Sequence, residues 1–160
     1  MFTASVQAAG FRLAVLALLL LSAAACSVKF VPDYDAATFE EILKTGKAVD
    51  RFYGEMLEVP ESDRTYAMYS TRYVAIETDL RSLLTRNKAR PLNQESIQIN
   101  EIILKLWLKY KDRHRTTGVY RDGDARPDRG RFTRLFTAAA DAEAAKKLDA
   151  DDRNPDKSSK

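Results

Sequence analysis

The sequence contains one cysteine, one histidine and one tryptophan among its 160 residues, and this scarcity limits the chemistry it can support. A single cysteine, Cys26, leaves no partner for an intramolecular disulfide. A single histidine, His114, excludes the paired Glu-x-x-His motifs of a di-metal carboxylate bundle. The motifs Gly-x-Ser-x-Gly and His-Glu-x-x-His and the phosphate-binding loop are also absent. We therefore expect no metal, no cofactor and no enzymatic activity.

The sequence also lacks an apolar run long enough to cross a membrane, which takes about 20 residues. The longest run, Leu13 to Ala25, is preceded by polar residues that include Gln7 and Arg12. Arg12 and the amino terminus supply positive charge, the run supplies an apolar centre, and its last alanines supply a cleavage position. This order predicts an export signal at residues 1–25 that is removed from the mature protein.

Cys26 lies directly after this run. The segment Leu21-Ser-Ala-Ala-Ala-Cys26 resembles the lipobox of bacterial lipoproteins, in which the first mature residue is a lipid-bearing cysteine. The resemblance implies that Cys26 carries acyl chains such as palmitate. It also implies that Ser27 directs the protein to the outer membrane, on the periplasmic face. The segment departs from the family at Ala23, where leucine is usual, and ordinary secretory cleavage, which would release a soluble protein, is the alternative.

Removal of the signal would leave 135 of the 160 residues, enough for one domain with a hydrophobic core. We expect a lipidated tether at residues 26–34, a helical domain at residues 35–148 and a disordered polar tail at residues 149–160. The net charge of the mature chain, about +2, is too small to indicate a nucleic-acid partner.

Apolar residues recur at alternating steps of three and four in four segments, which predicts four amphipathic helices. The first starts at the candidate N-cap Asp35 and ends near Leu57, and the second ends near Asn87. Pro91 and the candidate cap Asn93 open the third. The predicted buried stripes are Phe39, Ile42, Gly46, Val49, Tyr53 and Met56; Tyr66, Tyr69, Tyr73, Ile76, Leu80 and Leu83; Ile99, Ile102, Ile103, Leu106, Trp107 and Tyr110; and Phe132, Leu135, Phe136, Ala139 and Ala142.

No segment alternates with the period of two that a half-buried strand requires, so the fold class is all-α. The near-3.5 period of the four stripes predicts a small antiparallel four-helix bundle, most simply up-down-up-down. We assign the tyrosines of the first two helices and Trp107 to its core.

The segment between Lys111 and Arg134 has eight basic residues against four acidic ones, and it contains three glycines and Pro127. We expect a long connection here, with Pro127 in the first turn of the fourth helix. Two interpretations stay open: a surface that binds a periplasmic protein or the cell-wall polymer, and a solvated loop with local ion pairs. The candidate partner-binding residues are Arg113, Arg115, Arg121, Arg126, Arg129 and Arg131.

An up-down-up-down bundle returns the turn between the second and third helices to the membrane side. Arg86, Lys88 and Arg90 lie in or beside this turn and are candidate contacts for anionic headgroups. The alternative is that they offset the negative end of the helix dipole. The acidic segment from Asp122 to Asp128 lacks the spacing and the distal glutamate of a calcium loop, so we assign no metal site to it.

These observations favour a non-catalytic interaction or scaffold module of the cell envelope. One alternative is a protein similar to pilotins, small helical lipoproteins that escort an outer-membrane secretion subunit by binding a short amphipathic helix. A second is a cell-wall hydrolase that uses two carboxylates, such as Glu77 with another acid. The sequence does not predict an oligomeric state.

Overall fold

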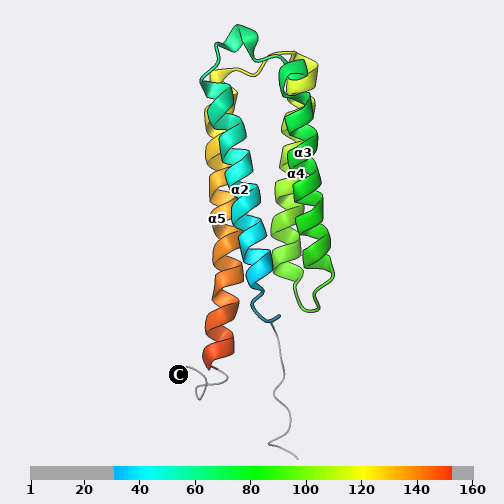
Figure 1. Ribbon diagram of the computed structural model, residues 1–160, viewed down its shortest axis with the longest axis vertical. Helices are drawn as coiled ribbons and strands as arrows, with labels where there is room; N and C mark the ends of the chain where they lie inside the picture. The colour runs from blue at the N-terminus through cyan, green and yellow to red at the C-terminus, as the bar shows by residue number, and fades with distance from the viewer. Residues whose placement is uncertain (1–30, 153–160) are drawn as a thin grey trace, which may run out of the picture. The chain divides into compact units, whose positions relative to one another are not determined.

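The computed structural model describes the backbone of residues 31–152 and the side chains of residues 31–147. Within this range the chain forms an all-α bundle of four helices, as predicted (Figure 1). The signal segment, Cys26, Ser27 and most of the tail lie outside the described residues. The elements in chain order are α2 (Ala36–Leu57), the 3-10 helix η1 (Glu61–Asp63), α3 (Tyr66–Lys88), α4 (Gln94–Thr117) and α5 (Asp122–Asp152).

The helices pack as two antiparallel pairs, α2 with α5 and α3 with α4, and the two pairs enclose the core (Figure 1). The chain approaches α2 beside the turn between α3 and α4, where Arg90 donates a hydrogen bond to the carbonyl oxygen of Asp33. We call this the tether end. The far end holds η1 and the connection Gly118–Arg121. The turn between α3 and α4 therefore lies beside the start of α2, as the up-down-up-down arrangement predicts, whereas the position of this end at a membrane stays a prediction.

The first two helices begin and end close to where the sequence predicts. Asp35 is the N-cap of α2, and its carboxylate accepts a hydrogen bond from the backbone N–H of Ala37 at 3.2 Å. α2 ends at Leu57, before Pro60, and α3 ends at Lys88, one residue beyond the predicted Asn87. Each helix buries one face, and among residues 31–152 none combines the length and apolarity needed to cross a bilayer.

α4 starts at the predicted place but not by the predicted contact. Asn93 occupies the N-cap position, yet its side chain makes no capping hydrogen bond and is 2% exposed. Its amide instead donates to the carbonyl oxygen and the side-chain oxygen of Asn87 at 3.1 and 2.7 Å. At the other end, Gly118 adopts φ +76° and its N–H donates to the carbonyl oxygen of His114, which closes the helix.

The prediction of a long connection between Lys111 and Arg134 is wrong. α4 continues to Thr117 and α5 begins at Asp122, so only residues 118–121 join them. Pro127 lies in the second turn of α5 rather than the first. The carbonyl oxygen of Arg121 accepts hydrogen bonds from two N–H groups of the first turn of α5, and Asp122 pairs with the buried Arg64. These contacts fix the start of α5 ahead of the proline.

The core is rich in aromatic rings, as predicted from the tyrosines and Trp107. Tyr53, Tyr73 and Trp107 are 0% exposed. Their rings surround Phe52, with ring centroids 4.7 to 5.2 Å from its own. The prediction for Ile102 is wrong: it is 48% exposed, because Ile103 and Leu104 turn inward in its place.

Candidate functional site

Two of the six arginines proposed as partner-binding residues are held at the far end of the bundle. Arg113 pairs with Asp124 at 3.1 Å and with the buried Asp128, and its guanidinium lies over the ring of Tyr110. Arg131 donates to the hydroxyl of Tyr110 and lies 3.7 Å from Asp128. Both side chains therefore contribute to the packing between α4 and α5.

Three more of these arginines form ion pairs on the surface. Arg129 donates two hydrogen bonds to Asp50 of α2, at 2.7 and 2.9 Å, and this arginine lowers the pKa of the Asp50 carboxyl. The other two pairs lie within single helices, Arg115 with Asp112 and Arg126 with Asp122.

Arg121 differs from the other five. Its guanidinium forms no hydrogen bond or ion pair with the rest of the described chain, and it lines a polar hollow with Glu61 and Asp124. The structure therefore does not gather the six arginines into one free basic patch. A partner role for them stays a prediction.

The three basic residues proposed for headgroups do lie at the tether end, and each has an acidic partner. Arg86 lies 3.8 Å from Asp35, and Lys88 lies 2.9 Å from Glu101; both basic side chains are about half exposed. Arg90 is different because only 15% of its side chain is exposed. It belongs to a buried cluster, whereas headgroup contacts by Arg86 and Lys88 remain a prediction.

That buried cluster joins three elements at the tether end, and the sequence analysis did not predict it. Glu143 of α5 is 0% exposed, and its carboxylate accepts hydrogen bonds from Arg90 at 3.0 Å and from Lys146 at 2.6 Å. It also accepts one from the backbone N–H of Asp35 at 2.9 Å. Burial raises the pKa of Glu143, but the hydrogen bonds from Arg90 and Lys146 outweigh it and the net pKa is lowered.

Lys146 is equally well satisfied. Its ammonium donates three hydrogen bonds, to Glu143, to the side-chain oxygen of Asn93 at 2.7 Å and to the hydroxyl of Ser96 at 2.9 Å. We call Arg90, Glu143 and Lys146 the tether-end cluster. Glu143 follows the buried Ala139 and Ala140 at helical spacing, and this spacing is the one sequence signal that could have placed it inside.

His114 has a structural environment too. Its Nε2 lies 2.8 Å from the carbonyl oxygen of Arg64, and its Nδ1 lies 3.1 Å from the hydroxyl oxygen of Tyr73. A carbonyl only accepts, so Nε2 carries the proton and Nδ1 accepts from Tyr73 when the ring is neutral. Burial lowers the pKa of His114, which favours this neutral form.

Glu77, the acid named for a hydrolase, lies on α3 with two basic neighbours. It accepts hydrogen bonds from Lys111 at 2.9 Å and from Arg81 at 2.8 Å, and these lower its pKa, with Lys111 the larger cause. A general acid needs the opposite shift. Among the described residues, no group of three or more His, Cys, Asp or Glu side chains is placed to hold a metal ion.

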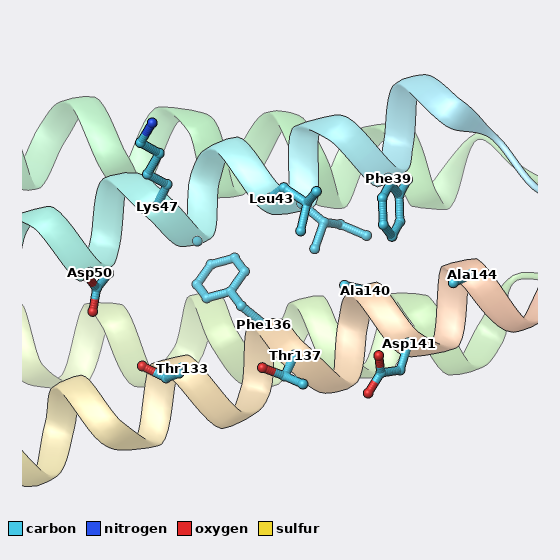
Figure 2. Close-up of a pocket in the computed structure, with 12 residues that line it drawn as sticks. Phe39, Leu43, Lys47, Asp50, Thr133, Phe136, Thr137, Ala140, Asp141 and Ala144 are labelled. Atoms are coloured by element: carbon cyan, nitrogen blue, oxygen red, sulfur yellow. The ribbon is translucent and has the colours of Figure 1, made fainter.

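An open groove of about 500 Å³ runs between α2 and α5, and its lining is mainly apolar (Figure 2). Phe39 and Leu43 extend from α2 toward α5, and Phe136 extends from α5 toward α2. Gly46 lets the helices approach, since a Cβ atom there would lie 3.0 Å from Cγ of Phe136. The remaining lining residues are Ile42, Lys47, Asp50, Thr133, Thr137, Ala140, Asp141 and Ala144.

Comparisons of the whole chain with known protein families, with curated proteins and with solved structures give no match.

Proposed function

We propose that this protein is a non-catalytic interaction module of the bacterial cell envelope, held on the periplasmic face of the outer membrane by lipid on Cys26. The observation that carries the interaction role is the groove between α2 and α5. Its walls are mainly apolar, and Leu43 in it is 51% exposed. Exposed apolar surface of this kind commonly marks a binding site.

The anchor rests on the sequence, namely the apolar run and Cys26 with Ser27 after it. Attachment through several acyl chains would be effectively permanent, because each buried methylene contributes about 0.8 kcal/mol. Only the short stretch from residue 27 to residue 31 separates Cys26 from the buried Pro32. Five residues span at most about 18 Å, so the bundle would stay close to the membrane.

The non-catalytic role is supported by the hydrogen bonds and the lowered pKa values of three titratable side chains. The residues that enzymes use most often, here His114, Glu77 and Glu143, all bond to neighbouring parts of the bundle. Their pKa values are lowered, so the histidine stays neutral and the two carboxylates stay ionised at neutral pH. None of these groups faces the apolar groove.

The anchor is tested by expressing the full chain in a Gram-negative host with labelled palmitate. Wild-type protein should take up label and fractionate with the outer membrane, and Cys26→Ser should do neither. Ser27→Asp is the matched control: it should keep the label and move the protein to the inner membrane. Membrane retention of Cys26→Ser without label would overturn the anchor.

The non-catalytic role is tested separately, by incubating the purified chain with cell-wall polymer and measuring released fragments. We expect release no faster than with heat-unfolded protein. Release that disappears in Glu77→Gln would instead establish a carboxylate hydrolase.

A further inference from the structure

The groove between α2 and α5 is open to solvent along one side, and its two edges carry charges of opposite sign. Its floor is apolar, with Phe39, Leu43 and Phe136 between the ribbons of α2 and α5 in Figure 2. Its length along α2, from Phe39 to Asp50, corresponds to about 16 Å of helix, or about three turns. An occupant must therefore bury one apolar face and leave the opposite face in water.

Both edges of the groove carry a charge without a partner in the described chain. Lys47 on α2 and Asp141 on α5 line the groove, and both are exposed. Neither forms a hydrogen bond or an ion pair with residues 31–147. Figure 2 shows the two side chains pointing away from the gap on opposite sides. This contrasts with Asp50 at the end of the groove, which is bound by Arg129.

The unpaired charges distinguish between occupants. A hydrocarbon chain would leave both charges without a partner, and an open groove buries less of a small ligand than binding sites usually do. An amphipathic helix has one apolar stripe with polar edges on both sides of it. Placed along the groove, such a helix brings one edge over Lys47 and the other over Asp141.

We propose that this groove binds an amphipathic α-helix of a partner protein, about three turns long, with an acidic side chain facing Lys47 and a basic side chain facing Asp141. The proposal deepens the interaction role given above and rests on it, but it does not depend on the lipid anchor. The partner's apolar stripe, spaced i, i+3 or i+4 and i+7, would cover Leu43 and the floor around Phe136.

The probe for this site is a fluorescein-labelled helical peptide of about 14 residues. It has leucines at i, i+3, i+7 and i+10, one Glu and one Lys on opposite edges of that stripe, and Ala and Gln elsewhere. Binding to the mature chain with Cys26→Ser is followed by fluorescence anisotropy. We expect saturable binding, reduced at least tenfold by Leu43→Asp, because a carboxylate would replace an apolar contact.

Val74→Asp on α3 is the matched control for the apolar contact. Val74 is exposed to a similar degree, 57% against 51% for Leu43, and lies outside the groove. Its variant should bind the peptide like the parent chain. Circular dichroism should show the same helicity in both variants, because both side chains are exposed.

The edge charges are tested with paired substitutions in protein and peptide. Lys47→Gln should weaken binding of the Glu-containing peptide about two- to fivefold and leave a Glu-to-Gln peptide unaffected. Asp141→Asn should behave in the same way toward the peptide lysine. Equal losses for charged and neutral peptides would overturn the proposed charge pairing.

Three further outcomes would overturn the proposal: no saturable binding, binding unchanged by Leu43→Asp, or concentration-dependent dimers that Leu43→Asp abolishes. The last would identify a second copy of this chain as the occupant. If the peptide binds but the wild-type full chain takes up no labelled palmitate, the groove proposal stands and only the lipid anchor fails.

Discussion

Removal of the charge of Glu143 should destabilise the bundle by about 3 kcal/mol, although the substitution Glu143→Gln preserves the shape of the side chain. The carboxylate accepts three hydrogen bonds, from Arg90, Lys146 and the N–H of Asp35. A glutamine offers one oxygen and an NH₂ group, so at least one of these donors would face another donor. Lys146, with 7% of its side chain exposed, would keep its charge without an anionic partner.

The magnitude follows from the remaining contacts. Breaking a buried ion pair by removal of one partner costs about 3 to 5 kcal/mol. The lower value applies here because Lys146 keeps two neutral acceptors, Asn93 and Ser96, and Arg90 keeps the carbonyl oxygen of Asp33. For a domain of this size, 3 kcal/mol corresponds to a decrease in melting temperature of about 10 °C.

The assay is urea unfolding at pH 7, followed by circular dichroism and by the fluorescence of the single tryptophan, Trp107, which is fully buried. Coincident transitions would justify a two-state analysis. Glu55→Gln is the control, because Glu55 pairs with Arg72 on the surface and both side chains are about half exposed. It should cost less than about 1 kcal/mol. A loss for Glu143→Gln no larger than that of the control would refute the reasoning.

Three other substitutions probe different contacts. Gly46→Val should lower stability by about 2 kcal/mol, because its branched side chain would overlap Phe136, and melting temperature measures the loss. Because the pKa of His114 is lowered in the folded chain, the unfolded chain takes up the proton at a higher pH than the folded chain does. The free energy of unfolding should therefore fall by up to about 1.4 kcal/mol between pH 7.5 and pH 5.5. Urea titrations at both pH values measure this change, and His114→Gln should reduce it. Arg64→Gln should cost about 3 kcal/mol by calorimetry, since the buried guanidinium binds backbone carbonyls at the far end, whereas the exposed Arg126→Gln should cost under about 1 kcal/mol.

Local sequence patterns were sufficient to predict the helices whose ends depend on neighbouring residues. Asp35 starts α2 through a contact two residues away. The step of three and four residues placed Tyr69, Tyr73 and Leu80 on one buried face of α3, because helical periodicity is set by the backbone. The bundle architecture then follows from four such faces and short connections.

The start of α5 could not be predicted in this way, because contacts distant in sequence decide it. Glycines and Pro127 indicated a connection, but Asp122 is held by Arg64, which lies 58 residues earlier in the chain. Among these glycines, Gly118 alone adopts a left-handed conformation within the described residues. The others are accommodated within a helix that tertiary contacts stabilise.

The candidate site could not be predicted from the sequence for a related reason. The groove exists only because α2 and α5 lie side by side, with Gly46 against Phe136, 90 positions apart in the chain. The burial of Glu143 and Lys146 likewise depends on Asn93 and Arg90 from the turn between α3 and α4. Glu143 follows the buried Ala139 and Ala140 at helical spacing, but charged residues on a helix usually face water, and this preference argued against placing Glu143 and Lys146 inside.

The tether-end cluster also determines how a pulling force would reach the bundle. The backbone of Asp33 and Asp35 is bonded to Arg90 and Glu143, which belong to the turn after α3 and to α5. A pull on residue 31 would load these bonds together with the first turn of α2, so α2 would not unwind alone. For a chain held at Cys26, as proposed above, the strain of movement between membrane and partner would be shared by three elements. Glu143→Gln should therefore lower the unfolding force measured by pulling from the N-terminal side.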